Sequence, residues 1–448
     1  MSKGKKIMVN NKIQREKKIE KIISNYTKEL LIIVLLVTSY AVNVPFLILV
    51  SFVLACGFVV FSEYRKAIYY LAFFTSFSGI FVYNGRHMFF VMAALFVMKS
   101  LISSKISRNT FFFYLIILTY SILFCDFQGE FSFAKIIGLI LMFVIPLIAY
   151  SSDKIDCKVF MQHYILGFVI STIIGLFAKN IPSMYRLFSV DLMWTENYLE
   201  LTRFFGLAFD ANFYALSNYT IVAYLLFAFE KITPFRGLLT LFLLITGVMT
   251  ISKSYFLVIG VLLICYIAKN ISSMKHIFIF ALVAIAGIWV FSAVSTKLGY
   301  NAITMITSRF VKGGSLADYT TGRTDIWKYY IDLFNANGIK ELLFGFGFNA
   351  KVTRAAHNTF IEFAYHYGII GLILWGAYLF YCLKLFQLKT EFFENRSSMV
   401  CICLIVGSFF LSAYSYESFW VGIVISFMTF GKRKRIGEEY VQRNSTNL

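Results

Sequence analysis

Long apolar runs recur along the whole chain, separated by short polar or basic stretches. The runs are continuous rather than alternating with period two, and many reach the length that crosses a bilayer as a helix. They predict an all-α polytopic membrane protein with about fourteen transmembrane helices, or twelve if two weak segments only lie along the membrane surface. The expected spans are residues 29–43, 45–62, 67–83, 88–104, 110–126, 133–150, 160–178, 209–229, 236–251, 254–268, 276–294, 357–383, 398–413 and 416–430.

The first two spans are separated on the strength of one break. The apolar stretch from Leu30 to Phe61 is too long for one span, and Asn43-Val44-Pro45 interrupts it. Fourteen spans place both termini on the cytoplasmic side, so the basic tails 1–28 and 432–448 lie together there. The positive-inside rule supports this topology, because basic residues recur at the predicted cytoplasmic turns. They are Arg65-Lys66, Lys105/Arg108, Lys154/Lys158, Lys231/Arg236, Lys269/Lys275 and Lys384/Lys389.

Composition agrees with the hydrophobic pattern. The 448 residues are 59% hydrophobic and only 15% charged, with a mean hydropathy of +0.73, which excludes an ordinary soluble globular protein. Seven cysteines, mostly inside apolar runs, show no spacing typical of a metal site or a disulfide framework. We therefore expect transmembrane helices over 29–294 with an external loop at 179–208, an external loop subdomain at 295–356, and C-terminal helices over 357–431.

The loop 295–356 mixes many cations with aromatic residues and fewer acids. Its cations are Lys297, Arg309, Lys312, Arg323, Lys328, Lys340, Lys351 and Arg354. Long loops escape the positive-inside rule, so these charges are compatible with a merely solvated surface. The interleaved aromatics favour instead a cationic cleft that binds an anionic ligand at the outer leaflet, with Arg309 among its substrate contacts.

Part of this loop is predicted to be helical. Thr321 is a candidate N-cap for a helix that begins near Gly322. Arg323, Trp327 and Tyr330 then share one face. An arginine beside aromatic rings suits a diphosphate bound bidentately and sugars stacked on the rings. The alternative is an amphipathic helix lying on the bilayer with its tryptophan at the interface.

A dense polar group opens the span that follows the loop. His357 precedes a helical stripe made of Asn358, Glu362, Tyr365 and His366. Ionisable groups at a membrane boundary are costly and are functional candidates by default. A lone histidine here would usually be structural, but two histidines, an asparagine and a glutamate within ten residues favour a site. Gly368 and Gly371 allow a close helix neighbour.

Two further cations lie at predicted external helix ends. Arg203 precedes a segment in which Asp210 is expected to cap the next span, with Asn212 in its first turn. An interfacial arginine that snorkels is as good an interpretation of Arg203 as an anion contact. Lys253 lies in a tight turn between two apolar segments, which suggests another positive contact for a phosphate.

These residues resemble the O-antigen polymerase and ligase superfamily of membrane glycosyltransferases, the Wzy and WaaL type, most clearly over about 200–375. The family typically shows an Arg-x-x-Gly…Asp-Pro-Asn run, a Ser-Arg-Ser-like turn, a Gly-Arg…Trp helix and a His-Asn helix start. The matching positions are Arg203, Gly206, Asp210, Asn212, Ser252-Lys253-Ser254, Gly322-Arg323, Trp327 and His357-Asn358. Ala211 replaces the usual proline, and Lys253 replaces an arginine, which keeps the charge but loses bidentate geometry.

The resemblance implies a C-type glycosyltransferase-like fold that uses an undecaprenyl-diphosphate-linked oligosaccharide, with no cofactor, nucleotide or metal. Arg203, Lys253 and Arg323 would then bind the diphosphate, and His357 would be the general base. Glu362 is the second candidate base or an orienter, and Asn358 would position an acceptor sugar. Further expected substrate contacts are Trp327, Tyr330, Asp210, Asn212, Arg309 and His366.

Within the superfamily, the length, the number of spans and the divergent motifs favour a surface-polysaccharide polymerase in the bacterial inner membrane, with a periplasmic active site. A ligase that transfers polysaccharide to lipid A–core is the alternative. A lipid-linked glycan transporter is more remote, because ionisable residues cluster at external helix ends rather than along a midplane pathway. Expected partners are membrane lipid and a chain-length regulator of the Wzz type, and no nucleic acid.

Overall fold

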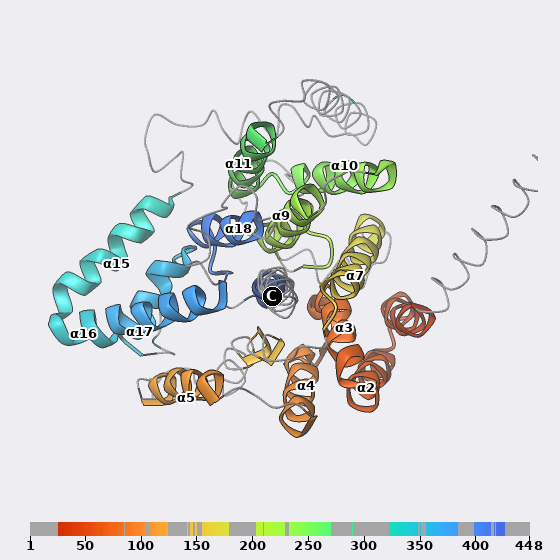
Figure 1. Cartoon of the computed structure of the whole chain (residues 1–448), viewed down its shortest axis with the longest axis horizontal. Coiled ribbons are helices and arrows are strands. Elements are labelled where there is room, and N and C mark those ends of the chain that lie inside the picture. The colour runs from red at the N-terminus through yellow and green to blue at the C-terminus, as the bar shows by residue number, and fades with distance from the viewer. Residues whose placement is uncertain are drawn as a thin grey trace, which may run out of the picture.

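The computed structural model is mostly helical (Figure 1). It describes residues 26–84, 86–103, 108–123, 141, 144–146, 148–149, 155–178, 203–208, 210–228, 233–269, 289, 322–347, 350, 355–383, 398–413, 416 and 418–425. Residues 1–25 of the predicted N-terminal tail, the whole tail 432–448, almost all of the span 276–294, most of the span 133–150, and the loop portions 179–202 and 295–321 lie outside these residues.

The N-terminal helices confirm the predicted break. A helix covers residues 26–41, and Asn43 follows it in a turn with a φ of 55°. The next helix, α2 (Pro45–Phe61), begins with proline at its first position. Proline suits that position because its missing N–H would have no partner there. α3 (Tyr64–Thr75) and α4 (Phe89–Ser103) pack against α2.

The connection between α3 and α4 differs from the prediction. α3 ends at Thr75 rather than continuing to 83, and the 3₁₀ turn η1 (Ser78–Ile80) follows it. β1 (Val82–Tyr83) then pairs antiparallel with β2 (Arg86–His87). Asn84 has a φ of 50°, which a two-residue hairpin turn requires and asparagine tolerates. An Asn-Gly pair is the typical signal for such a turn, so this hairpin was readable from the sequence.

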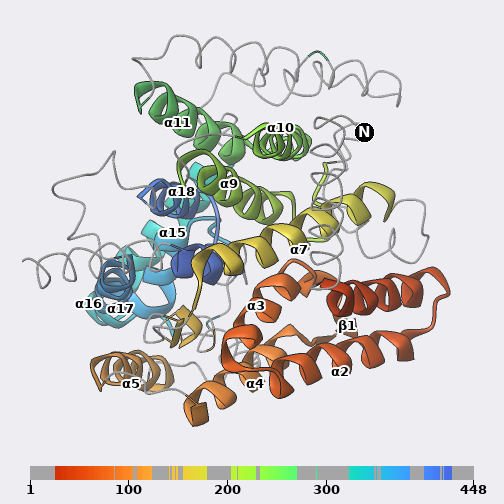
Figure 2. The ribbon, with the colours of Figure 1, turned by 45° about the vertical axis from the view of Figure 1, so that its right-hand side comes forward.

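The centre of the protein is built around α9 (Ala211–Phe227). Nearly every residue of this helix is buried, because it packs against α10 (Pro234–Val248), α11 (Lys253–Lys269) and α18 (Ser398–Ser408). α7 (Cys157–Phe177) joins this group to α3 (Figure 2). The Tyr214 hydroxyl of α9 bonds Thr172 of α7 at 3.0 Å and Thr246 of α10 at 2.9 Å. Such side-chain bonds hold apolar helices together where no water is present.

A third group lies beside it and contains the helices of the loop that was predicted to be external (Figure 1). α15 (Arg323–Asn337) and α16 (Ile339–Phe344) pack on α17 (Thr359–Leu383), and α5 (Arg108–Leu123) contacts α17 as well. The predicted single span 357–383 is interrupted, because Gly368 (φ 67°, ψ −173°) leaves the helical region inside α17. A Cβ at Gly368 would overlap the Leu343 carbonyl, so the kink lets the end of α16 approach the α17 backbone.

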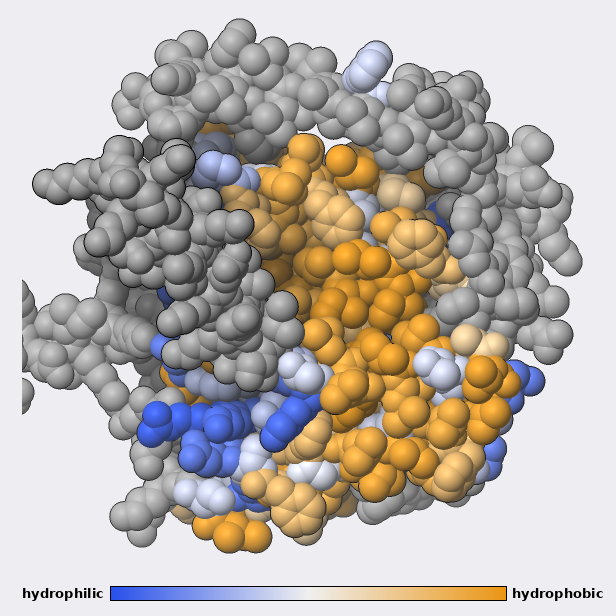
Figure 3. Space-filling model, turned by 90° about the vertical axis from the view of Figure 1, so that its right-hand side faces the viewer, coloured by the Kyte–Doolittle hydropathy of each residue, from blue (hydrophilic) through white to orange (hydrophobic). Residues whose placement is uncertain are grey.

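The outer surface matches a membrane protein. α7 and the Thr359–Tyr378 part of α17 are long and apolar enough to cross a bilayer, and several shorter apolar helices accompany them. Large apolar side chains are exposed, for example Phe46 and Phe61 on α2 and Phe235 on α10. Figure 3 shows a broad apolar area on the face that lies at the right of Figure 1. An apolar face of this extent is costly in water and suits lipid contact.

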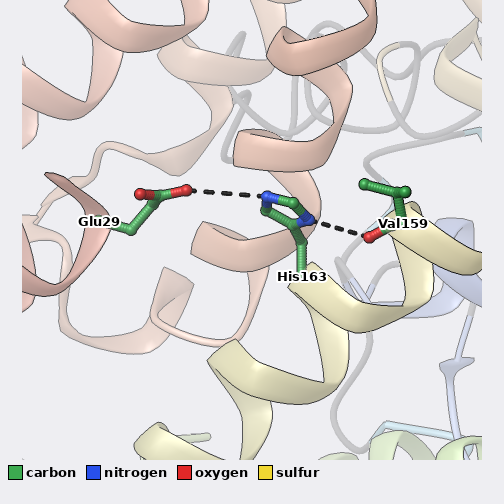
Figure 4. A network of polar contacts seen from close by, with 3 residues as sticks. All are labelled: Glu29, Val159 and His163. Atoms are coloured by element: carbon green, nitrogen blue, oxygen red, sulfur yellow. Dashed lines mark hydrogen bonds and ion pairs between the residues drawn. The ribbon is translucent and has the colours of Figure 1, made fainter. Parts of the chain in front are cut away.

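One buried polar pair lies between the first helix and α7, far along the chain from the predicted site. The Glu29 carboxylate is 3.8 Å from Nε2 of His163, whose Nδ1 donates to the Val159 carbonyl at 2.9 Å (Figure 4). Tyr26 and Tyr69 pack against the His163 ring. The pair ties the two helices together.

Candidate active site

The segment that enters α9 positions the first candidate residues. Asp210 is the N-cap of α9, as predicted, and its Oδ1 accepts the Asn212 backbone N–H at 2.6 Å. This bond satisfies one of the free N–H groups at the helix start. Gly206 has a φ of 57°, and its backbone lies against Gly175 of α7. The turn therefore directs the chain from Arg203 back to the start of α9.

Arg203 is half-buried and anchored by two neutral acceptors. Its Nε donates to the Thr250 carbonyl at 2.9 Å, and Nη2 donates to Oδ1 of Asn212 at 3.2 Å. Within the described ranges, no carboxylate forms an ion pair with Arg203. The guanidinium is thus fixed in place while its positive charge is not neutralised by a salt bridge to the part of the chain that the structure describes.

The turn between α10 and α11 supplies the next group. Ile251 has a φ of 49°, which is strained for a β-branched residue and marks a tightly constrained turn. The Ser252 hydroxyl donates to Oδ1 of Asn212 at 2.7 Å and lies 2.8 Å from the Ser254 hydroxyl. Lys253 is the first residue of α11. A cation at a helix start adds to the positive end of the dipole, so this end of α11 favours anions.

The third candidate cation, Arg323, is the first residue of α15. The N-cap of this helix is Gly322 in the left-handed region (φ 74°), not the predicted Thr321, because glycine reaches that backbone conformation without steric cost. Arg323 opens the helix, and one turn later Nε1 of Trp327 donates to the Ala356 carbonyl at 3.0 Å. The predicted shared face therefore points toward the chain just before α17.

An aromatic cluster fixes α15 on α17. Tyr330 is 0% exposed and packs edge-on against Tyr365 at 5.1 Å, while Phe346 stacks on Tyr365 at 4.7 Å. Burial in this cluster keeps the Tyr330 ring away from solvent, so the structure does not present it for sugar stacking. Aromatic pairs of this kind add about 0.5–1.5 kcal/mol each beyond their buried area.

The Phe344-Gly345-Phe346-Gly347 turn caps the first half of α17. The kink at Gly368 frees carbonyls of the preceding turn, and Phe346 N–H donates to the Tyr365 carbonyl at 2.8 Å. Gly347 N–H donates to the His366 carbonyl at 3.1 Å, and Nδ1 of His366 donates to the Gly347 carbonyl at 3.0 Å. His366 is only 8% exposed, so this exchange gives it a structural role at the kink.

The start of α17 carries the predicted catalytic group. Asn358 is buried and acts as the N-cap, because its Oδ1 accepts the N–H groups of Phe360 at 2.9 Å and Ile361 at 3.1 Å. It therefore precedes the helix rather than forming the top of the predicted stripe. His357, one residue earlier, has a φ of 48° and an exposed side chain. The turn presents the imidazole to solvent.

A segment after α18 supports this helix start from behind. The Thr359 hydroxyl donates to the Leu411 carbonyl at 2.6 Å and accepts the Ala413 N–H at 2.8 Å. The Ser412 hydroxyl donates to the Glu362 carboxylate. Sequence analysis missed Ser412, since nothing in its local sequence indicates a partner fifty residues away. This contact favours an orienting role for Glu362.

Two observations bring the α9 and α17 helix starts together. Phe213, near the start of α9, stacks at 4.4 Å on Tyr416, which belongs to the segment after α18 that supports α17. The electrostatic surroundings of His357 include both Arg323 and Asp210. Partial burial and then the Arg323 charge lower the pKa of His357 below its ordinary value, while Asp210 opposes them. A histidine with a lowered pKa stays neutral at neutral pH and can accept a proton.

Most predicted site residues thus lie at one end of the protein. Arg309 lies outside the described residues, and Tyr330 and His366 are buried in packing roles. Within the described ranges, no three His, Cys, Asp or Glu side chains are grouped as metal ligands would be. The expectation of a metal-free reaction stays a prediction.

The apolar helices indicate a membrane protein, and the candidate cations lie at or just before the starts of α9, α11 and α15. Residues 238–376 match the family model described as O-Antigen ligase (Wzy_C). The matched region runs from α10 to α17 and contains Lys253, Arg323 and His357, while Arg203 lies before it. This match supports the predicted resemblance to the superfamily of O-antigen polymerases and ligases over that part of the chain, and it does not distinguish the two activities. No match to the chain was found among the curated proteins.

Proposed function

We propose that the protein is a surface-polysaccharide polymerase that joins repeat units carried on undecaprenyl diphosphate, at the outer face of the bacterial inner membrane. The observation that carries the proposal is the geometry around Arg203. Among the described residues, a carbonyl and an amide oxygen hold this half-buried guanidinium, and both are neutral, so it keeps its charge for an anionic ligand. The superfamily acts on lipid-linked polysaccharide, whose diphosphate is such an anion.

Three cations would share the donor diphosphate. Arg203 is fixed beside the α10–α11 turn, Lys253 opens α11 in the same turn, and Arg323 opens α15 near His357. Cations and a helix start that are already in position stabilise charge as it develops on the leaving diphosphate, without reorganising during the reaction. This preorganised stabilisation is the main source of rate acceleration in the proposal.

His357 would act as the general base. The acceptor sugar hydroxyl attacks the anomeric carbon of the donor, the bond from that carbon to the diphosphate oxygen breaks, and undecaprenyl diphosphate leaves with the electron pair. The hydroxyl proton passes to one ring nitrogen of His357, which its lowered pKa keeps neutral beforehand. Glu362 orients the site through Ser412, and Asn358 holds the turn by capping α17.

A ligase that transfers the finished chain to lipid A–core is the second candidate. It is favoured by the description of the matched family, whereas length and the divergent Lys253 and Ala211 favour the polymerase. Both activities need the same donor site and the same base. A chain-length regulator of the Wzz type belongs to the polymerase proposal as a partner.

The test is a surface-polysaccharide gel of a deletion strain that is complemented with the wild type or with His357→Ala. Polymerase activity predicts that the deletion leaves a single repeat unit on lipid A–core and that His357→Ala fails to restore the ladder, although its protein reaches the membrane. Long chains that stay on the lipid carrier, with none attached to lipid A–core, would identify the ligase. An unchanged ladder in the deletion strain would reject both activities.

A further inference from the structure

The Asn212 side chain is the meeting point of two elements that come from distant parts of the chain. Its Oδ1 accepts Nη2 of Arg203 at 3.2 Å and the Ser252 hydroxyl at 2.7 Å. Asn212 itself is fixed in the first turn of α9 by the Asp210 cap. A single amide oxygen therefore joins the segment before α9, the α9 helix and the α10–α11 turn.

The chemistry of these groups sets the direction of every hydrogen bond. A guanidinium only donates, so the atom of Asn212 that faces Arg203 must be the amide oxygen and not the nitrogen. Since that oxygen only accepts, Ser252 must donate its one hydroxyl proton to it. Ser254, 2.8 Å from Ser252, must then donate to the Ser252 oxygen. The resulting chain runs from Ser254 through Ser252 to Asn212, and bonds in such chains strengthen one another.

The neutrality of Asn212 is as informative as its geometry. An aspartate at this position would accept the same two hydrogen bonds with nearly the same shape. It would also place a full negative charge about 3 Å from the Arg203 guanidinium and form a salt bridge. The nearby acid, Asp210, uses Oδ1 for the α9 N-terminus, where a carboxylate suits the helix dipole.

We propose that Asn212, held by Ser252, is a positioning residue that orients Arg203 toward a diphosphate while leaving its charge uncompensated. This inference rests on the proposed function and deepens it, because it assigns Asn212 and Ser252 to the binding of the donor diphosphate through Arg203. It replaces the predicted direct contact of Asn212 with substrate. Ser252 is 1% exposed and Ser254 is 5% exposed, which suits support from behind rather than contact with a ligand.

The decisive variant is Asn212→Asp, which preserves the hydrogen bonds and changes the charge. Its matched control is Asn335→Asp, which adds the same charge on the exposed surface of α15, away from this network. Ser252→Ala removes the support of Asn212 without adding charge. The probe is farnesyl diphosphate, which carries the diphosphate and a prenyl chain without any sugar, and its affinity for the full-length protein in detergent is measured by calorimetry.

We expect Asn212→Asp and Arg203→Gln each to weaken binding of farnesyl diphosphate by roughly tenfold or more, since each removes one uncompensated positive charge from the anion site. Ser252→Ala should weaken binding by roughly two- to fivefold, the range for one lost neutral hydrogen bond. Asn335→Asp should bind like the wild type. A loss as large in Asn335→Asp as in Asn212→Asp would mean that any added negative charge is sufficient, and would overturn the inference.

A double-mutant cycle separates an action through Arg203 from a general structural effect. If Asn212, held by Ser252, works by orienting Arg203, then adding the neutral change Ser252→Ala to Arg203→Gln changes the affinity little. An equal loss in both backgrounds would overturn the positioning role. If Arg203→Gln weakens binding and Asn212→Asp does not, only this inference fails. If Arg203→Gln itself binds like the wild type, the diphosphate site of the proposed function fails with it.

Discussion

The hydrogen bond from Trp327 to the Ala356 carbonyl can be tested by a change that keeps the aromatic ring. Trp327→Phe removes the Nε1–H group that donates to the Ala356 carbonyl at 3.0 Å, so this carbonyl, next to His357, loses that hydrogen bond. A hydrogen bond of this kind contributes about 0.5–1.5 kcal/mol. His357 has a φ of 48°, a conformation that the surrounding contacts must hold. If this hydrogen bond holds the turn at His357 in its active conformation, the turnover of Trp327→Phe falls by roughly two- to twelvefold, because about 1.4 kcal/mol corresponds to a factor of ten.

The assay is the initial rate of polymer formation from lipid-linked repeat units in membranes, per amount of protein, over a range of substrate concentrations. We expect a lower kcat with little change in KM, because the turn is misplaced while the donor site is intact. The control Tyr329→Phe removes a hydroxyl from an exposed ring of the same helix and should keep the wild-type rate. A Trp327→Phe enzyme with wild-type turnover, or one that changes only KM, would refute the role in holding His357. Full activity in Trp327→Phe with loss in Trp327→Ala would support the predicted sugar stacking instead.

Three further changes test the pKa of His357, the kink at Gly368 and the role of the Glu362 carboxylate. Arg323→Gln removes a charge that lowers the pKa of His357, so that pKa rises toward its ordinary value and the acid limb of the pH–rate profile moves to higher pH; an unmoved limb would contradict the assignment. Gly368→Ala places a Cβ against the α16 backbone at a φ of 67° and should destabilise the protein by about 2 kcal/mol or more, measured as thermal unfolding in detergent. Gly376→Ala, with open space around it, should unfold at or above the wild-type temperature. Glu362→Gln keeps an acceptor for its hydroxyl partner, so an orienting role predicts a loss of activity below about tenfold, whereas a loss as large as that of His357→Ala would make Glu362 the base.

Local signals in the sequence predicted the helix starts well. Asp210 was expected to cap α9 and does so, because a short acidic side chain before an apolar run has few other roles. The Asn43-Val44-Pro45 break separates two helices as expected, since it contains both a left-handed residue and a proline. These features depend only on residues that are neighbours in the chain, so they can be derived without tertiary contacts.

The predictions that failed concern irregular backbone inside apolar stretches. The span expected over 67–83 ends at Thr75, and a hairpin that contains Asn84 follows it. The helix after the loop is kinked at Gly368, although hydropathy runs through that position without interruption. Hydropathy reports whether a segment can lie in an apolar environment, but it does not report where its backbone hydrogen bonds go.

The kink shows why the polar stripe could be predicted only in part. Equal spacing along an ideal helix placed Asn358, Glu362 and His366 on one face. In the structure Asn358 precedes the helix as its cap, and His366 closes the first half of α17 by bonding Gly347. Glu362 remains inside the regular helix and accepts the hydroxyl of Ser412, which lies fifty residues later in the chain. The same residues are near one another as predicted, but each meets a different partner.

The same distinction explains the cationic site. Residue type and position at a helix end were enough to select Arg203, Lys253 and Arg323, because a cation at the end of an apolar span is costly wherever it lies. What separates a binding cation from an interfacial one is whether its partners neutralise it, and this depends on residues far apart in the chain. For Arg203 the partners are the Thr250 carbonyl and the amide oxygen of Asn212, both neutral. An arginine that extends to the membrane interface is solvated there by water and headgroups, without fixed protein acceptors. The two fixed acceptors of Arg203 therefore favour the anion contact over the interfacial interpretation.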